Sequence, residues 1–174
     1  MGLYPTWFEG DTTAAPGTLF HYTNRRALAK ILKDGAILPH RATPAEQVGS
    51  VWFTTNAVWE PSAGRMSPLG RPYTFEEMVS QNGGLGRILV DAAAAPLSLK
   101  ALRRLIGPAM QLVISGGRRI TAPAGSPQLD TFFKANEGRW FGTTRPVSRA
   151  YWLAVEVWKS PRWVEVAYLW EEDA

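Results

Sequence analysis

The sequence predicts a single mixed α+β domain. It has 174 residues, 45% of them hydrophobic and 20% charged, which is the size and composition of one globular domain. Strand-like runs lie near both ends and helical patterns lie between them, an order typical of α+β architecture. We expect residues 1–17, which contain several prolines and glycines, to form an irregular arm, and residues 18–174 to form the domain.

The first strand and helix are marked by their end residues. Residues 18–23 (TLFHYT) are β-branched and aromatic, as strands often are. Asn24 has the short amide typical of an N-cap, an apolar stripe at helical spacing follows it, and Gly35 is a typical residue after a helix. A second strand is expected over 50–56 (SVWFTTN), with a loop over 60–72.

The remaining elements follow from similar signals. Thr74 and Glu77 form a capping box, which predicts a short helix through Gln81. The next expected elements are a strand at 85–90, a helix at 98–106, a strand at 111–115, turns at 116–125, a helix at 127–136 and an aromatic loop at 138–146. Two final strands, 151–159 and 163–170, are joined by a Ser160–Pro161–Arg162 turn.

Composition excludes several classes of function. The chain has no cysteine and only two histidines, His21 and His40, so disulfides and thiolate nucleophiles are excluded and no metal is expected. The formal net charge of +4 permits a phosphate-bearing partner without forming the basic stripe of a duplex-binding protein. Because neither a secretory start nor an apolar run of about 18 residues is evident, we expect a cytoplasmic protein with no membrane association.

Two short patterns bear on chemistry. The glycine-rich stretches at 83–86 and 115–118 lack the neighbours of a nucleotide-binding loop, so we interpret them as turns. Glu156 lies between two valines in a strand-like run. A carboxylate there must either face a site or be buried at a cost in free energy.

The chain resembles the ADP-ribosyltransferase superfamily in two short runs. The first is Leu19-Phe20-His21-Tyr22-Thr23, which is followed by a helix that ends in Asp-Gly, and the second is Val51-Trp52-Phe53-Thr54-Thr55. The likeness is greatest to the small bacterial and phage branch that opens with HYT, a helix and a glycine. It implies a split mixed/antiparallel sheet with flanking helices. It also implies an NAD-dependent enzyme that cleaves the nicotinamide–ribose bond and modifies a macromolecule, as a toxin or phage counter-defence factor. The net charge of +4 favours nucleic acid over protein as that macromolecule, because cations attract phosphates.

The same resemblance implies roles for individual residues. Glu156 would hold the nicotinamide ribose 2′-hydroxyl, and His21 would bind the adenosine ribose; we expect the two to line one cleft. Trp52, Phe53 or Tyr22 would take the place of the family's stacking aromatic. Independently of the resemblance, Arg25, Arg26 or Arg65 could bind the pyrophosphate through charge-assisted hydrogen bonds. The residues expected to be catalytic are Glu156 and His21. The full set expected to bind NAD is His21, Tyr22, Thr23, Trp52, Phe53, Thr54 and Arg65.

Alternatives remain open for both residues and function. Glu165 and Glu60 are alternatives to Glu156, since each lies in or beside a predicted strand. A carboxylate suits this chemistry because the bond breaks through an oxocarbenium-like state. The alternative function is a catalytically inactive module that sequesters a nucleotide or a protein partner through a surface rich in tryptophan. A third is a nucleic-acid binder without enzymatic activity.

Overall fold

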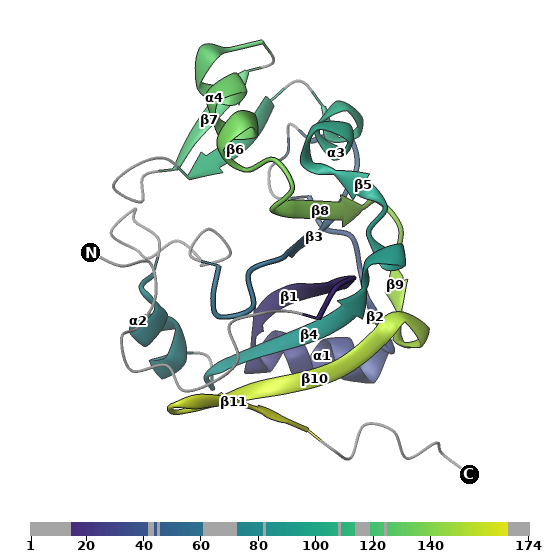
Figure 1. The fold of residues 1–174 in the computed structure, drawn as a ribbon, viewed down its shortest axis with the longest axis vertical. Coiled ribbons are helices and arrows are strands. Elements are labelled where there is room, and N and C mark those ends of the chain that lie inside the picture. Colours follow the sequence, from purple (N-terminus) through teal and green to yellow (C-terminus); the bar gives the residue numbers. More distant parts are fainter. Residues whose placement is uncertain are drawn as a thin grey trace.

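The computed structural model describes residues 15–41, 44, 46–60, 73–81, 83–107, 109–113, 119–123 and 125–166. Its main element is a seven-stranded sheet of order β11-β10-β4-β1-β3-β8-β5 (Figure 1). Each pairing recorded between described strands is antiparallel. The prediction of a mixed α+β fold is therefore confirmed, with an antiparallel sheet and a few helices.

The main sheet is formed by strands from both ends and the middle of the chain. It contains β1 (Thr18–Asn24), β3 (Val51–Thr54), β4 (Leu85–Asp91), β5 (Leu97–Ser98), β8 (Trp140–Thr143), β10 (Trp152–Lys159) and β11 (Arg162–Glu165). Outside it, β2 (Ala36–Ile37) pairs with β9 (Val147–Ser148), and β6 (Ala109–Val113) pairs with β7 (Arg119–Pro123). The helices are α1 (Arg25–Asp34), α2 (Phe75–Ser80), α3 (Leu99–Ile106) and α4 (Pro127–Ala135), with 3-10 turns at Ala92–Ala94 and Arg149–Tyr151.

Helix ends coincide with the capping residues that the sequence marks. The Asn24 side chain accepts a hydrogen bond of 2.8 Å from the Ala27 N–H, and Gly35 ends α1 with a left-handed φ of 66°. Thr74 and Glu77 form both bonds of the capping box, so α2 begins where predicted.

Two segments predicted as turns or loop contain strands instead. Part of 116–125 is β7, and part of 138–146 is β8, which lies between β3 and β5 in the main sheet. Gly138 and Gly142 favour a loop locally, but the β8 backbone pairs with β3, and Trp140 packs edge-on against Trp52. Tertiary contacts therefore outweigh local propensity here. The predicted loop at 61–72, and the parts of the predicted arm and last strand at 1–14 and 167–170, lie outside the described residues.

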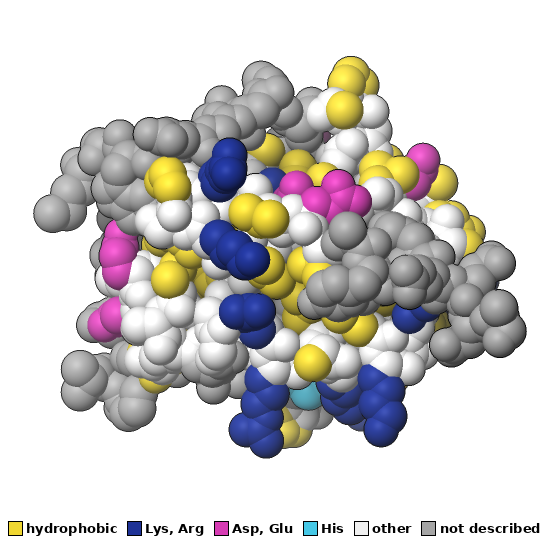
Figure 2. All heavy atoms as spheres, turned by 90° about the horizontal axis from the view of Figure 1, so that it is seen from below, with side chains coloured by type: hydrophobic (Ala, Val, Ile, Leu, Met, Phe, Trp, Pro, Cys, Tyr) yellow, Lys and Arg dark blue, Asp and Glu magenta, His cyan; other side chains and the backbone are white. Residues whose placement is uncertain are grey.

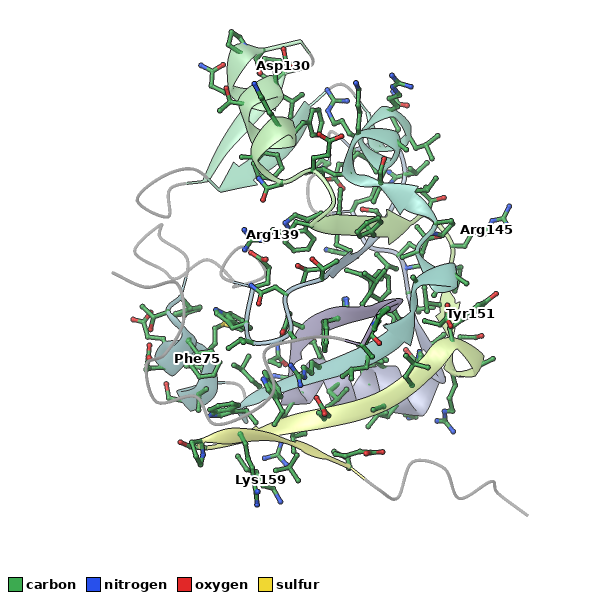
Figure 3. All side chains as sticks on the ribbon, in the orientation of Figure 1. Phe75, Asp130, Arg139, Arg145, Tyr151 and Lys159 are labelled. Carbon is green, nitrogen blue, oxygen red and sulfur yellow. The ribbon has the colours of Figure 1, made fainter. Side chains whose placement is uncertain are left out.

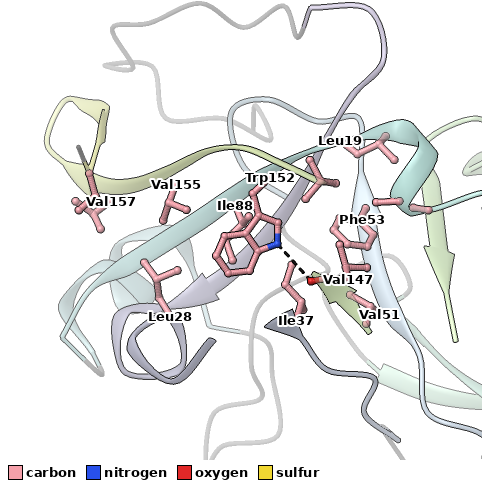
Figure 4. Packing of buried hydrophobic residues seen from close by; sticks show 14 residues of the cluster. Leu19, Leu28, Ile37, Val51, Phe53, Ile88, Val147, Trp152, Val155 and Val157 are labelled. Atoms are coloured by element: carbon pink, nitrogen blue, oxygen red, sulfur yellow. Dashed lines mark hydrogen bonds between the residues drawn. The ribbon is translucent and has the colours of Figure 1, made fainter. Parts of the chain in front are cut away.

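Side chains of the strands alternate between the two faces of the sheet. We call one of them the α1 face, because α1 covers it through Leu28. The side chains that point to this face include Leu19, His21, Phe53, Ile88 and Val155. This face holds a large apolar cluster, in which the Trp152 indole donates a hydrogen bond of 3.4 Å to the Val147 carbonyl (Figure 4).

The opposite, α2 face carries Tyr22, Thr54, Arg87 and Glu156. α2 packs onto it through Phe75 and Met78, which lie in one cluster with Tyr22, Trp59 and Trp158. Toward the β8 end, α3 and α4 form a separate cluster with Trp52 and Trp140. The α2 face is thus covered at its two ends by different helices (Figure 1).

The sheet is joined unevenly at β1. Seven residue pairs register β1 with β4, whereas a single pair, Phe20 with Thr54, registers β1 with β3. Beyond this pair, side chains bridge the two strands: His21 Nδ1 lies 3.0 Å from the Trp52 carbonyl oxygen, and the Tyr22 hydroxyl donates to the Asn56 carbonyl at 2.6 Å. The β1–β3 junction therefore depends on side chains more than on a backbone ladder.

Candidate functional site

A row of polar side chains crosses the α2 face. Tyr22, Arg87, Glu156 and Glu165 are paired in register on the neighbouring strands β1, β4, β10 and β11. Arg87 Nε donates to Glu156 Oε2, and the side chains of Arg87 and Glu156 are 8% and 17% exposed. Glu156 is therefore held by a buried guanidinium while part of its side chain still reaches solvent.

The Arg87 guanidinium lies close to two aromatic rings. Its Cζ lies 4.4 Å from the centroid of Trp163 and 4.9 Å from that of Phe20. Such cation–π contacts strengthen when they are shielded from water. A second edge of the guanidinium donates, through Nη1, to the carbonyl of Ala57.

The segment 55–60 is fixed by side-chain donors rather than by regular secondary structure. Four successive carbonyls, those of Asn56, Ala57, Val58 and Trp59, each accept one side-chain hydrogen bond. Their donors are, in order, the Tyr22 hydroxyl, Arg87 Nη1, the Trp163 indole at 3.1 Å and Asn56 Nδ2. Because three of these donors come from the α2 face, the segment is tied to the same face as Glu156.

Glu60 ends this segment as a buried carboxylate. Its Oε2 accepts from Arg139 Nη2 at 2.8 Å and Nε at 2.9 Å, and from the Thr54 hydroxyl at 3.3 Å. Arg139 lies where the chain enters β8 (Figure 3). Its two N–H groups reach one carboxylate oxygen, which links β8 to the end of β3.

Tyr22 lies between these charges as a neutral donor. Burial raises the pKa of its hydroxyl well above the ordinary value of 10.0, and Glu60 and Glu156 raise it further, while Arg87 opposes the shift. The hydroxyl proton is therefore retained at neutral pH and is given to the Asn56 carbonyl.

His21 lies on the other face of the sheet, with its ring centroid 5.6 Å from that of Phe53. A carbonyl only accepts hydrogen bonds, so the contact with Trp52 requires the proton on Nδ1 and leaves Nε2 as an acceptor. Burial lowers the pKa of the imidazole, partly offset by this backbone bond. Neutral His21 thus serves to hold β3 beside β1.

The structure brings together some of the sequence-predicted residues and separates others. Tyr22, Thr54 and Glu156 share the α2 face, and Glu60 joins them through Thr54. His21, Thr23 and Phe53 project from the α1 face.

This corrects the expectation that His21 and Glu156 line one cleft. On β4, His21 pairs with Ile88 and Glu156 pairs with Arg87. Consecutive residues of a strand point to opposite faces, so the two side chains diverge.

The predicted aromatic and basic residues are also dispersed. Phe53 is 0% exposed in the core. Trp52 is partly buried on β3, which lies three strand positions from β10, or about 14 Å across the sheet. Arg25 and Arg26 are exposed at the start of α1, and Glu165 is exposed on the edge strand. Arg65 lies outside the described residues.

Sequence reasoning missed Arg87 and Arg139. The signal for Arg87 was present, because it is the single charge among the apolar residues and glycine of 85–90, the same pattern that marks Glu156. Arg139 lies in a segment predicted as loop, and nothing local marks it as the partner of a carboxylate 79 residues away.

Comparison with family models, with curated proteins and with solved structures found no match. Within the described parts of the chain, no group of three or more histidine or acidic side chains is arranged to hold a metal ion. Among the described helices, none has the length and apolar character needed to cross a membrane.

Proposed function

We propose that this chain is an NAD-dependent ADP-ribosyltransferase in which Glu156 acts on the nicotinamide ribose. The observation that carries the proposal is the state of the Glu156 carboxylate. Arg87 binds Oε2, and Oε1 accepts no hydrogen bond from any described residue. A fixed carboxylate with one oxygen that holds no hydrogen bond to the described residues is suited to accept a ribose hydroxyl and to stabilise an oxocarbenium-like state.

The architecture supports a sheet of the split type. β1 pairs with β4 along its whole length but with β3 through one residue pair. This junction divides the strand order into β11-β10-β4-β1 on one side and β3-β8-β5 on the other. The strand that carries Glu156 lies two positions from β1, on the β4 side. The resemblance supplies the family, and this arrangement of strands is compatible with it.

Tyr22, rather than His21, stands on the same face as Glu156 in this proposal. His21 contributes by holding β3 through the Trp52 carbonyl, and it is a positioning residue for the β1–β3 junction. Trp52 is kept as a contact for a distal part of the dinucleotide, because it lies on the α2 face at the far side of β1.

Nucleic acid is favoured as the acceptor by the charge of the surface. Helix α1 exposes Arg25, Arg26, Lys30 and Lys33. Seen from the β11 edge of the sheet, Lys and Arg side chains form a row across the face of the molecule and a group at its lower border (Figure 2). Such side chains attract phosphates in a salt-dependent way.

The test is release of nicotinamide from NAD, with single-stranded DNA, duplex DNA, RNA or a protein mixture added as acceptor. Wild type should release nicotinamide, and Glu156→Gln should lower the rate by about 100-fold, the usual cost of losing one transition-state interaction. Glu165→Gln is the matched control, because Glu165 pairs with Glu156 in register yet is exposed, and it should keep the wild-type rate within about twofold. If wild type releases no more nicotinamide than a blank with every acceptor, the proposal fails.

One observation favours the second candidate, an inactive module that binds a nucleotide or a protein partner. Both residues expected to be catalytic already hold an intramolecular partner, Arg87 for Glu156 and the Trp52 carbonyl for His21. Calorimetric binding of NAD without nicotinamide release would favour this function over the enzyme.

A further inference from the structure

Arg87 connects two parts of the α2 face that are otherwise separate in sequence. Its Nε binds Glu156 on β10, 69 residues away, and its Nη1 binds the Ala57 carbonyl in the segment 55–60, 30 residues away. The two bonds use different nitrogens of one planar group. The carboxylate and the segment are therefore held at a fixed position relative to each other.

The guanidinium itself has little freedom to move. It contacts the rings of Trp163 and Phe20, and its side chain is almost fully buried. Trp163 is in turn held by its indole bond to the Val58 carbonyl, next to Ala57. A lysine would provide a single charged point in place of this planar fork.

Stability alone does not require this arrangement. Burying an ion pair costs desolvation energy, and apolar side chains of similar volume often serve stability equally well. Apolar side chains in this place would adjoin the buried cluster that contains Phe20, Tyr22, Trp59 and Trp158. A charged pair in this place is better explained by a need to hold the carboxylate.

We propose that Arg87 is a positioning residue: it binds Oε2 of Glu156 and the segment 55–60 together, and so leaves Oε1 as the oxygen that meets the ribose hydroxyl. This inference rests on the proposed function of Glu156. Arg87 acts through the carboxylate and does not itself contact the substrate.

The first test is a double-mutant cycle on nicotinamide release with Arg87→Gln, Glu156→Gln and the double variant. Arg87→Gln should lower kcat by about 100-fold, as expected for a misplacement of about 1 Å, with KM changed less than threefold. The double variant should be no slower than Glu156→Gln, because Arg87 works only through that carboxylate. Arg87→Lys, the milder change, should recover less than a tenth of the wild-type kcat. Additive losses in kcat, or full recovery by lysine, would overturn the proposal.

The second test measures the link between Glu156 and the segment 55–60 without using catalysis. Hydrogen exchange of the amides in 55–60 should become faster in Glu156→Gln as well as in Arg87→Gln, because releasing one end of the fork loosens the other. Arg103→Gln is the matched control: it removes another buried guanidinium, bound to the Gly107 carbonyl, and should leave exchange in 55–60 unchanged.

The two tests separate failure of the proposal from failure of the proposed function. If wild type releases no nicotinamide, the proposed function fails. Hydrogen exchange of the amides in 55–60 then tests by itself whether Arg87 couples Glu156 to that segment. Faster exchange of 55–60 in Glu156→Gln then supports the coupling through Arg87, and unchanged exchange overturns it.

Discussion

His21 and Tyr22 are adjacent in β1, yet they bridge to the β3 region from opposite faces of the sheet. His21 reaches the Trp52 carbonyl on the α1 face, and Tyr22 reaches the Asn56 carbonyl on the α2 face. Between them they close the junction where the β1–β3 ladder has a single residue pair. The HYT run therefore has a structural role that is separate from any role in binding a nucleotide.

Replacing Tyr22 by phenylalanine should weaken this junction. The change removes one hydroxyl and leaves the Asn56 carbonyl without its donor, so we expect the free energy of unfolding to fall by roughly 1–2 kcal/mol. Urea unfolding monitored by tryptophan fluorescence measures the loss. Tyr151→Phe is the matched control, because Tyr151 is exposed, and it should change stability by less than about 0.5 kcal/mol. Equal losses in the two variants would contradict the role given to the Tyr22 hydroxyl.

His21 should make the stability of the fold depend on pH. Burial lowers its pKa from the ordinary 6.5, so the folded chain takes up the proton less readily than the unfolded chain. The contribution that neutral His21 makes to the free energy of unfolding is fully present above about pH 6.5. It is lost as the pH falls from there through the lowered pKa of the folded state.

Urea unfolding at pH 7.5, 6.5 and 5.5 tests this dependence while most carboxylates stay ionised. In His21→Asn the free energy of unfolding should depend less steeply on pH than in wild type, because the amide can donate to the Trp52 carbonyl and does not titrate in this range. His40→Asn, at an exposed position, is the control and should keep the wild-type slope. A slope that survives in His21→Asn would show that another group is responsible.

Local signals in the sequence predicted much of the fold. Asn24 and Gly35 set the two ends of α1, and Thr74 and Glu77 set the start of α2, as expected, because capping acts between residues a few positions apart. β8 was predicted as loop because its place in the sheet is decided by β3 and β5, which no local pattern encodes.

The candidate site was harder to predict than the fold, for a related reason. That Glu156 lies in a strand follows from its neighbours, but the face it occupies depends on its register with β4. A shift of one residue would have placed it on the face of His21. The partnership of Arg87 with Glu156 depends on the same long-range register, so it could not be read from either strand alone.

Two glycines in the sheet should respond differently to alanine. At Gly142 an added Cβ would lie 2.5 Å from the Val51 carbonyl oxygen and against Leu102, whereas at Gly86 it would lie 2.6 Å from Leu28 Cδ2, the mobile end of a side chain. Backbone paired in a sheet cannot give way as a leucine methyl can. We therefore expect Gly142→Ala to cost roughly 2–3 kcal/mol and Gly86→Ala about 1 kcal/mol.

Chemical denaturation of the two variants measures both losses. Combining Gly86→Ala with Leu28→Ala should cost less than the sum of the single changes, because the shortened side chain makes room for the new methyl group. Equal losses at the two glycines, or strict additivity with Leu28→Ala, would show that α1 does not pack on Gly86 in this way.

Glu60 and Glu156 are both carboxylates of the α2-face network, and substitution should separate their roles. Glu60 is 2% exposed and receives two N–H groups of Arg139, so Glu60→Gln mainly disturbs a buried ion pair. Because Arg139 is 32% exposed, part of the lost charge interaction is screened by water, and we expect the free energy of unfolding to fall by roughly 1–3 kcal/mol. Arg139→Gln should have a similar cost, and the double variant should recover part of it.

Nicotinamide release, measured below the unfolding transition and normalised to folded protein, tells the two carboxylates apart. Glu60→Gln should keep the rate within about threefold of wild type, because its carboxylate is engaged by Arg139 and Thr54, whereas Glu156→Gln should lose about 100-fold. The reverse pattern, a stable Glu60→Gln variant that releases no nicotinamide, would move the catalytic role from Glu156 to Glu60. Glu156 would then be a structural partner of Arg87, since its Oε2 accepts from that guanidinium in either case.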